Sequence, residues 1–138
     1  MATLKISDLS VGDWVRYRDR EWEVCSIYQF TEEVGLFRKD SQICESIEDI
    51  ESIPITAEIL EKNGFTRGQR GDFYHYLRLD KNRTLYIHAS TNGWRAEITY
   101  DAAGILRTTH LVPDMNSVHV LQHALRLAGV EKEINLLS

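Results

Sequence analysis

Alternation of apolar and polar residues marks four short strands in the second half of the chain. The strands are expected at Phe73–Leu79, Thr84–Ser90, Trp94–Tyr100 and Ile105–Val112, because a side-chain period of two is typical of a sheet with one buried face. The segments between them are short and rich in turn residues, which favours hairpin connections. The pattern therefore predicts a four-stranded antiparallel meander.

The two faces of this meander differ in character. One face is largely apolar and consists of Phe73, His75, Leu77, Leu79, Leu85, Ile87, Ala89, Trp94, Ala96, Ile98 and Tyr100. The opposite face carries Glu97 and Thr99 together with a set that we call the tyrosine face: Tyr74, Tyr76, Arg78, Tyr86, His88 and Arg95. Packing of the apolar set into a core leaves the tyrosine face outward.

A helix is expected near the carboxy terminus, after Pro113. Asp114, Asn116 and Ser117 offer N-caps for it. At 100° per residue, half of its circumference is apolar: Val118, Val120, Leu121, Ala124, Leu125, Leu127 and Ala128. The opposite arc holds His119, Gln122, His123 and Arg126. We predict that the apolar half packs on the sheet and that the polar arc faces solvent.

A second, shorter helix is expected between the two halves of the chain, just after Pro54. Thr56 can cap its first turn, and Gly64 supplies a left-handed stop. The segment between them predicts a two-turn helix over residues 57–63.

The first part of the chain is rich in aromatic and β-branched residues. Gly12–Tyr28 is typical of a hairpin interrupted at Asp19 and Arg20, and further strands are expected at Val34–Arg38 and Gln42–Cys44. The opening Gly-Asp-x-Val is similar to that of SH3-like small barrels. A single helical turn is expected after Ser46.

These elements predict an α+β fold within the size range of one domain. Residues 1–53 form a β-rich, SH3-like lobe, and residues 54–138 form the short helix, the meander and the closing helix, the two parts together making one compact unit. Hydrophobic residues at 43% and charged residues at 27% argue against disorder and against a coiled coil.

Charge is distributed unevenly along a chain whose net charge is −5. Residues 1–55 hold 6 Lys or Arg against 12 Asp or Glu, whereas residues 62–107 hold 8 against 4. We expect neither secretion nor membrane insertion, because residues 1–10 contain no apolar run and no later stretch approaches the length needed to span a bilayer. We therefore expect a cytoplasmic protein in which Cys25 and Cys44 are free, partly buried thiols.

Candidate catalytic and metal sites are weak. His119 and His123 have the spacing of two metal ligands, and His110 or Asp114 could supply a third, but Val120 stands where the zinc-protease pattern needs glutamate. No nucleophile motif surrounds the cysteines, and the loop GFTRGQRG lacks the Gly-Lys-Ser/Thr of a phosphate-binding loop. We expect no metal, no cofactor and no enzymatic activity.

The tyrosine face is the strongest functional candidate because it combines flat rings with positive charge. Single-stranded nucleic acid is bound by that combination, although tyrosine is also simply a good strand former. The acidic chain favours a protein partner or self-association, so we expect a protein-interaction module. The alternative is a weak binder of single-stranded nucleic acid that uses this face, and no membrane interaction is expected.

Three segments together resemble a known group of proteins. They are Gly12-Asp13-Trp14-Val15, Ile53–Thr56 and Val118–Gln122. The chain is similar in them to small proteins encoded in gut Bacteroides genomes and in their prophages or mobile elements. No activity is attached to that group, so the resemblance implies a bacterial or phage-infected cell as the setting and no particular chemistry.

Overall fold

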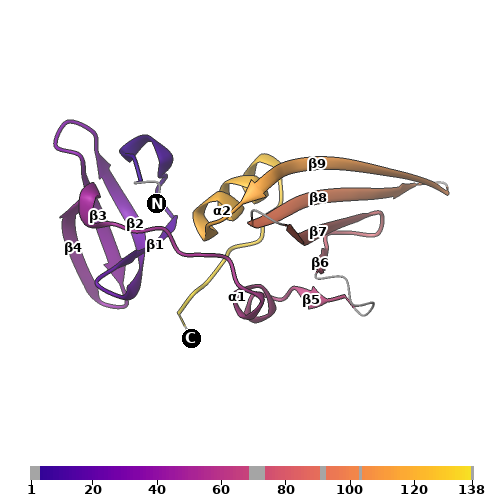
Figure 1. The fold of residues 1–138 in the computed structure, drawn as a ribbon, viewed down its shortest axis with the longest axis horizontal. Helices are drawn as coiled ribbons and strands as arrows, with labels where there is room; N and C mark the ends of the chain where they lie inside the picture. The colour runs from indigo at the N-terminus through magenta and orange to yellow at the C-terminus, as the bar shows by residue number, and fades with distance from the viewer. Residues whose placement is uncertain (1–3, 69–73, 91–92, 103, 138) are drawn as a thin grey trace. The chain divides into compact units, whose positions relative to one another are not determined.

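The predicted α+β fold is confirmed. A computed structural model describes residues 4–68, 74–90, 93–102 and 104–137. Its elements are η1 (Ile6–Asp8), β1 (Trp14–Tyr17), β2 (Arg20–Tyr28), β3 (Glu33–Arg38), β4 (Ser41–Ser46), η2 (Ile47–Asp49), α1 (Ala57–Lys62), β5 (Thr66–Arg67), β6 (Tyr74–Arg78), β7 (Arg83–Ser90), β8 (Gly93–Ala102), β9 (Ile105–Met115) and α2 (Val118–Leu127) (Figure 1).

Two compact units divide the chain. The first consists of Met1–Pro54 with Ser117–His119 and Leu136–Ser138. The second consists of Ile55–Asn116 and Val120–Asn135.

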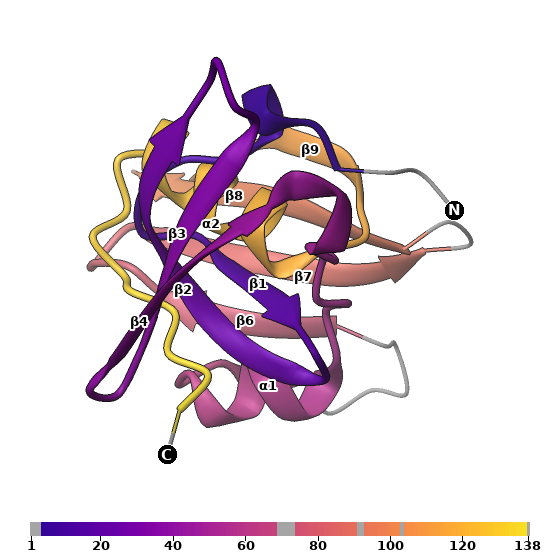
Figure 2. The ribbon, with the colours of Figure 1, turned by 90° about the vertical axis from the view of Figure 1, so that its left-hand side faces the viewer.

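The first unit is built on an antiparallel sheet in the order β1-β2-β3-β4 (Figure 2). Arg18 and Asp19 both have positive φ, which is the geometry of a tight two-residue hairpin turn between β1 and β2. An isolated bridge joins Arg16 to Glu51 and so pairs β1 with the segment after β4. The expected β-rich lobe is therefore present.

Apolar side chains of β1, β2 and β3 and of the segments that flank the sheet form its core, and Ile43 of β4 packs against it. The buried members are Leu9, Val15, Tyr17, Val24, Val34, Leu36, Ile47 and Ile50. The helical turn expected after Ser46 is η2, whose first turn is capped by a hydrogen bond from the Glu48 amide to the Ser46 hydroxyl.

The second unit contains the predicted meander with one additional strand. Its sheet has the order β5-β6-β7-β8-β9, and every neighbouring pair is antiparallel. The extra strand, β5, contributes only Thr66 and Arg67. Leu85, Ile87, Ala96 and Ile98 are buried, as their position on the apolar face predicts.

The expectation that Pro113 ends the last strand is wrong, because β9 continues through it to Met115. β9 is the edge strand of the sheet, and its pairing with β8 is irregular between Trp94 and Ala96. Proline has no amide hydrogen to donate, so it is tolerated at such edges and bulges.

Helix α1 begins and ends where its capping residues predict. The Thr56 hydroxyl accepts a hydrogen bond from the Ile59 amide at 3.2 Å, and Gly64 has φ +89° just after the helix. The Phe65 amide then donates to the Leu60 carbonyl, which satisfies one of the last carbonyls of the helix.

The predicted exposure of α2 needs two corrections. Leu121 and Leu125 are buried as expected, but Leu127 is 84% exposed. His119 and Gln122, which the helical pattern places on the solvent side, are buried, with His119 only 4% exposed. The first unit includes Ser117–His119 and the second resumes at Val120, so α2 begins in one unit and continues in the other.

Some sequence-based predictions lie outside the described residues. These are the placement of Phe73, the turn at residues 91–92, residues 69–71 of the glycine-containing loop, and the side chains of His110 and Asp114.

Candidate functional site

Strand pairing brings the tyrosine face together across three strands. Tyr74 pairs with His88, Tyr76 pairs with Tyr86, and His88 pairs in turn with Arg95 on β8. The three tyrosines, His88 and Arg95 are partly exposed, and Arg78 at the end of β6 is exposed. All six candidate residues therefore reach solvent.

Four rings of this face form one connected cluster. The ring centroid of Tyr74 lies 6.4 Å from that of Tyr76, 5.9 Å from that of Tyr86 and 5.8 Å from that of His88. Tyr86 and His88 are stacked with an interplanar angle of 21° at 5.9 Å. The rings thus present a shared aromatic surface on a hydrogen-bonded sheet.

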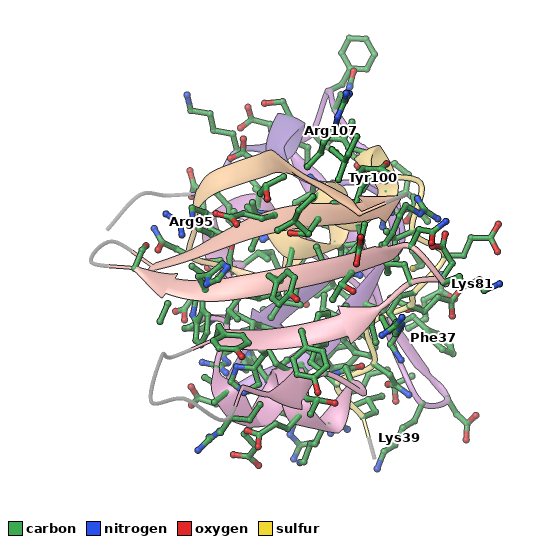
Figure 3. All side chains as sticks on the ribbon, turned by 90° about the vertical axis from the view of Figure 1, so that its right-hand side faces the viewer. Phe37, Lys39, Lys81, Arg95, Tyr100 and Arg107 are labelled. Atoms are coloured by element: carbon green, nitrogen blue, oxygen red, sulfur yellow. The ribbon has the colours of Figure 1, made fainter. Side chains whose placement is uncertain are left out.

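A buried carboxylate neutralises the positive charge beside these rings. Glu97 on β8 has one oxygen 2.8 Å from Arg95 Nε and the other 3.5 Å from His88 Nε2. Glu97 is 8% exposed, so water screens its interaction with Arg95 only weakly. Arg95, which Figure 3 labels on the outer face of the sheet, is therefore an ion-pair partner within the protein.

Two cations without a carboxylate partner among the described residues lie at the β6–β7 end of the face. Arg78 donates a hydrogen bond from Nη2 to the Lys81 carbonyl at 3.3 Å, and the Lys81 side chain is exposed (Figure 3). Arg83, by contrast, is held by Asp80 at 2.7 Å. Any anion attracted to this face is therefore attracted to Arg78 and Lys81.

The turn that carries these cations is ordered by Asp80. Its carboxylate accepts hydrogen bonds from the Asn82 and Arg83 amides, each at 2.9 Å, as well as from Arg83 Nε. Hydrogen bonds from the Asn82 amide and then from Arg83 lower the pKa of Asp80 below its ordinary value. The turn sets the register in which Tyr76 faces Tyr86.

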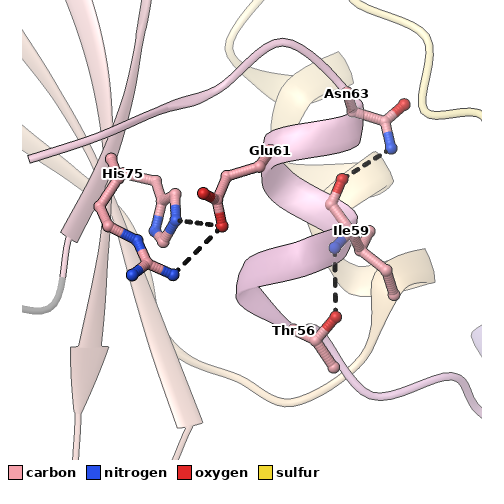
Figure 4. A network of polar contacts seen from close by, with 6 residues as sticks. Thr56, Ile59, Glu61, Asn63 and His75 are labelled. Atoms are coloured by element: carbon pink, nitrogen blue, oxygen red, sulfur yellow. Dashed lines mark hydrogen bonds and ion pairs between the residues drawn. The ribbon is translucent and has the colours of Figure 1, made fainter.

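Helix α1 is joined to the back of β6 by a polar contact that sequence reasoning missed. Glu61 lies 3.3 Å from Arg67 Nη2 on β5 and 3.5 Å from His75 Nε2 on β6 (Figure 4). His75 is 3% exposed, and its ring packs edge-on to Trp94 at 6.0 Å. The Trp94 indole donates a hydrogen bond to the Ile55 carbonyl. The contacts of His75 with Glu61 and Trp94 therefore hold β6 from the face of the sheet opposite Tyr74 and Tyr76.

Gly68 is a second residue that the sequence did not identify. A Cβ atom at this position would collide with the ring of Tyr74. The Gly68 amide donates to the Tyr74 carbonyl at 2.9 Å. The Tyr74 ring therefore packs directly against the backbone of Gly68. Because Gly68 stands in a glycine-rich loop, its role cannot be recognised from the sequence.

The sequence candidates for chemistry are not assembled into a site in the described part of the chain. The described residues contain no group of three His, Cys, Asp or Glu side chains that could hold a metal ion. Cys25 and Cys44 are free; Cys25 is partly buried as expected, but Cys44 is exposed. No helix among residues 4–68, 74–90, 93–102 and 104–137 is long and apolar enough to cross a membrane.

Comparisons with known proteins found no match for this chain. No family model matches the chain, and neither a curated protein nor a solved structure matches it. The likeness to proteins of Bacteroides and their mobile elements stays a prediction.

Proposed function

We propose that the protein is a non-enzymatic interaction module that binds a partner protein through the tyrosine face. The observation that carries this proposal is the connected cluster of Tyr74, Tyr76, Tyr86 and His88, which reaches solvent from adjacent strands. Tyrosine and arginine are enriched at binding hot spots. Tyrosine in particular offers a large, rigid contact area at a low cost in side-chain entropy.

The charges around the rings favour protein over nucleic acid. A polyanionic strand is best bound by cations spaced along its length. Along this face Arg95 and His88 already lie next to Glu97, and only one end carries Arg78 and Lys81 without a carboxylate among the described residues. A partner that brings one or two carboxylates beside apolar groups matches this arrangement better.

The partner segment is therefore expected to be short, acidic at one end and aromatic or apolar at the other. Its apolar side chains would cover the ring cluster, and its carboxylates would approach Arg78 and Lys81. Residues 62–107, with 8 basic against 4 acidic side chains, give the segment that contains this face the opposite charge to such a partner.

Selection from a displayed library of short random peptides tests this proposal. The wild-type chain should enrich peptides that combine Asp or Glu with aromatic residues, and Tyr76→Ala should lose that enrichment. Tyr100→Ala is the matched control, because Tyr100 is an exposed tyrosine that lies outside the tyrosine face. Enrichment that persists in Tyr76→Ala, or no enrichment by the wild type, would contradict the proposal.

A second candidate function is weak binding of single-stranded nucleic acid by the same face. It is favoured by the near-parallel stack of Tyr86 and His88, since bases stack on such rings. Stacking of one base is worth about 1–3 kcal/mol, so Tyr76→Ala should weaken binding by roughly tenfold. Arg78→Ala should reduce the salt dependence, because a phosphate contact acts through release of counterions.

Titration of labelled oligothymidine and oligouridine at low salt decides between the two candidates. Binding that Tyr76→Ala weakens would support the nucleic-acid function, and absence of binding by the wild type would end it. The peptide selection remains informative in either case, because it uses a different probe.

A further inference from the structure

One face of the first sheet carries a cysteine directly opposite a glycine. Gly35 on β3 pairs with Ser26 of β2 on one side and with Cys44 of β4 on the other. Paired residues direct their side chains to the same face of a sheet, so Ser26 and Cys44 lie on the face to which a side chain at position 35 would point. This face is opposite the core, because Val34 and Leu36, the two chain neighbours of Gly35, are both core members.

An irregularity in β2 places Cys25 on the same face. The register between β2 and β3 shifts between Val24 and Ser26, so Cys25 is the extra residue of a β-bulge. A Cβ atom at Gly35 would lie 3.3 Å from Cys25 Sγ. The Cys25 sulfur therefore lies beside position 35, on the face that also carries Cys44.

Both sulfur atoms have contacts on neighbouring strands. Gln42 stands two residues before Cys44 on β4, and its Nε2 atom lies 3.8 Å from Cys25 Sγ. Cys44 Sγ lies 4.0 Å from a carboxylate oxygen of Glu33 on β3. Partial desolvation, two neighbouring glutamates and then Cys25 raise the pKa of the Cys44 thiol. The two thiols are therefore close enough to interact across Gly35.

The spacing of the strands suits a bridge that is longer than a disulfide. Because β3 lies between β2 and β4, the Cα atoms of Cys25 and Cys44 are separated by two strand spacings, roughly 9.5 Å. A disulfide joins Cα atoms that are about 4.4–6.8 Å apart. A metal ion between the two sulfur atoms adds two bonds of about 2.3 Å each and so spans the larger separation.

We propose that Cys25 and Cys44 together bind one soft, two-coordinate metal ion, Cu(I). Thiolate sulfur is a ligand that selects Cu(I). Zinc requires at least three protein ligands, and the described residues contain no group of three His, Cys, Asp or Glu side chains that could hold a metal ion. Each thiol releases its proton when its sulfur binds the ion, and the oxidation state of copper does not change. Glu33 attracts the cation, although its charge also opposes formation of the Cys44 thiolate.

Native mass spectrometry of the full chain, reduced and then mixed with Cu(I) without oxygen, tests the site. The wild type should bind one copper ion per chain. Cys25→Ser and Cys44→Ser should each weaken binding roughly 100-fold or more in competition with a chromogenic Cu(I) chelator, because the second thiolate acts at a high effective concentration. Gln42→Ala is the matched control, since it changes an exposed residue of the same face without removing a thiol, and it should bind like the wild type.

Alkylation of the copper-loaded chain gives a second readout at each sulfur. One equivalent of Cu(I) should protect both Cys25 and Cys44 of the wild type from N-ethylmaleimide, and it should protect neither remaining cysteine in the two serine variants. Cys44 is exposed, so Cys44→Ser should fold like the wild type. A wild type that binds no copper, undiminished binding by Cys25→Ser, or one copper ion shared between two chains would overturn the inference. The tyrosine face takes no part in this site, so Tyr76→Ala should bind copper normally.

Discussion

Tyr76 on β6 lies directly opposite Tyr86 on β7, and their ring centroids are 6.3 Å apart. Cross-strand aromatic pairs contribute roughly 0.2–1 kcal/mol beyond alanine pairs. A double-mutant cycle of Tyr76→Ala and Tyr86→Ala, measured by denaturant unfolding, should give a favourable coupling energy in that range. Tyr76→Phe should leave stability nearly unchanged, because it keeps the ring. A coupling energy of zero would mean that the two rings do not pack against each other.

Leu125 on α2 should be far more important for stability than His123 two residues before it. Leu125 is 2% exposed, whereas His123 is only partly buried. Leu125→Ala should cost about 2–5 kcal/mol of unfolding free energy, since it removes buried methyl groups and leaves a cavity. His123→Ala should cost much less. Equal losses in urea melts of the two variants would show that the helix does not turn Leu125 toward the core.

Asp80 should stabilise the β6–β7 turn in a pH-dependent way. Its pKa is lowered in the folded chain, chiefly by the hydrogen bond from the Asn82 amide and then by Arg83. A lowered folded pKa gives stability that is present above the unfolded value of about 3.9 and is lost as the pH falls through the folded pKa. Asp80→Asn should therefore lower the Tm at neutral pH, and the difference from wild type should shrink below about pH 4. A difference that stays constant from neutral to acid pH would contradict this assignment.

Cys44 should react slowly with alkylating reagents although it is exposed. Its pKa is raised, first by partial desolvation and then by the negative charges of Glu33 and Glu45. Because only the thiolate reacts, alkylation by iodoacetamide at neutral pH should be slower than that of free cysteine. Glu33→Gln should accelerate it. Peptide mass spectrometry over a time course can follow Cys44 separately from Cys25, and a rate above that of free cysteine would rule out this environment.

Local signals predicted much of the fold because they act within a few residues. Thr56 caps α1 and Gly64 follows it, and strand alternation alone places Leu85 and Ile98 on the buried face. The predictions that failed depend on neighbours distant in sequence. His119 is buried although the helical pattern places it on the polar arc, and β9 continues through Pro113 at an edge of the sheet, where proline is tolerated.

In the candidate site, too, local patterns predict which residues lie together, but not the contacts between side chains that are distant in sequence. Side-chain parity along β6, β7 and β8 predicts which residues form the tyrosine face. It could not predict that Glu97 would neutralise Arg95, since that pairing depends on side-chain conformation within the sheet. Glu61 contacts His75, and Gly68 lies close to the Tyr74 ring, only because of the path that the chain takes after α1. That path cannot be predicted from local sequence patterns.

The most direct test of the central claim maps where a selected acidic peptide binds. Amide spectra of the isotope-labelled chain should be recorded while the peptide is added. We predict that the shifts concentrate on residues 74–78, 83–90 and 95–99, and that Tyr76→Ala abolishes them. Shifts concentrated in the first unit, or unchanged shifts in Tyr76→Ala, would contradict the claim that the tyrosine face is the binding surface.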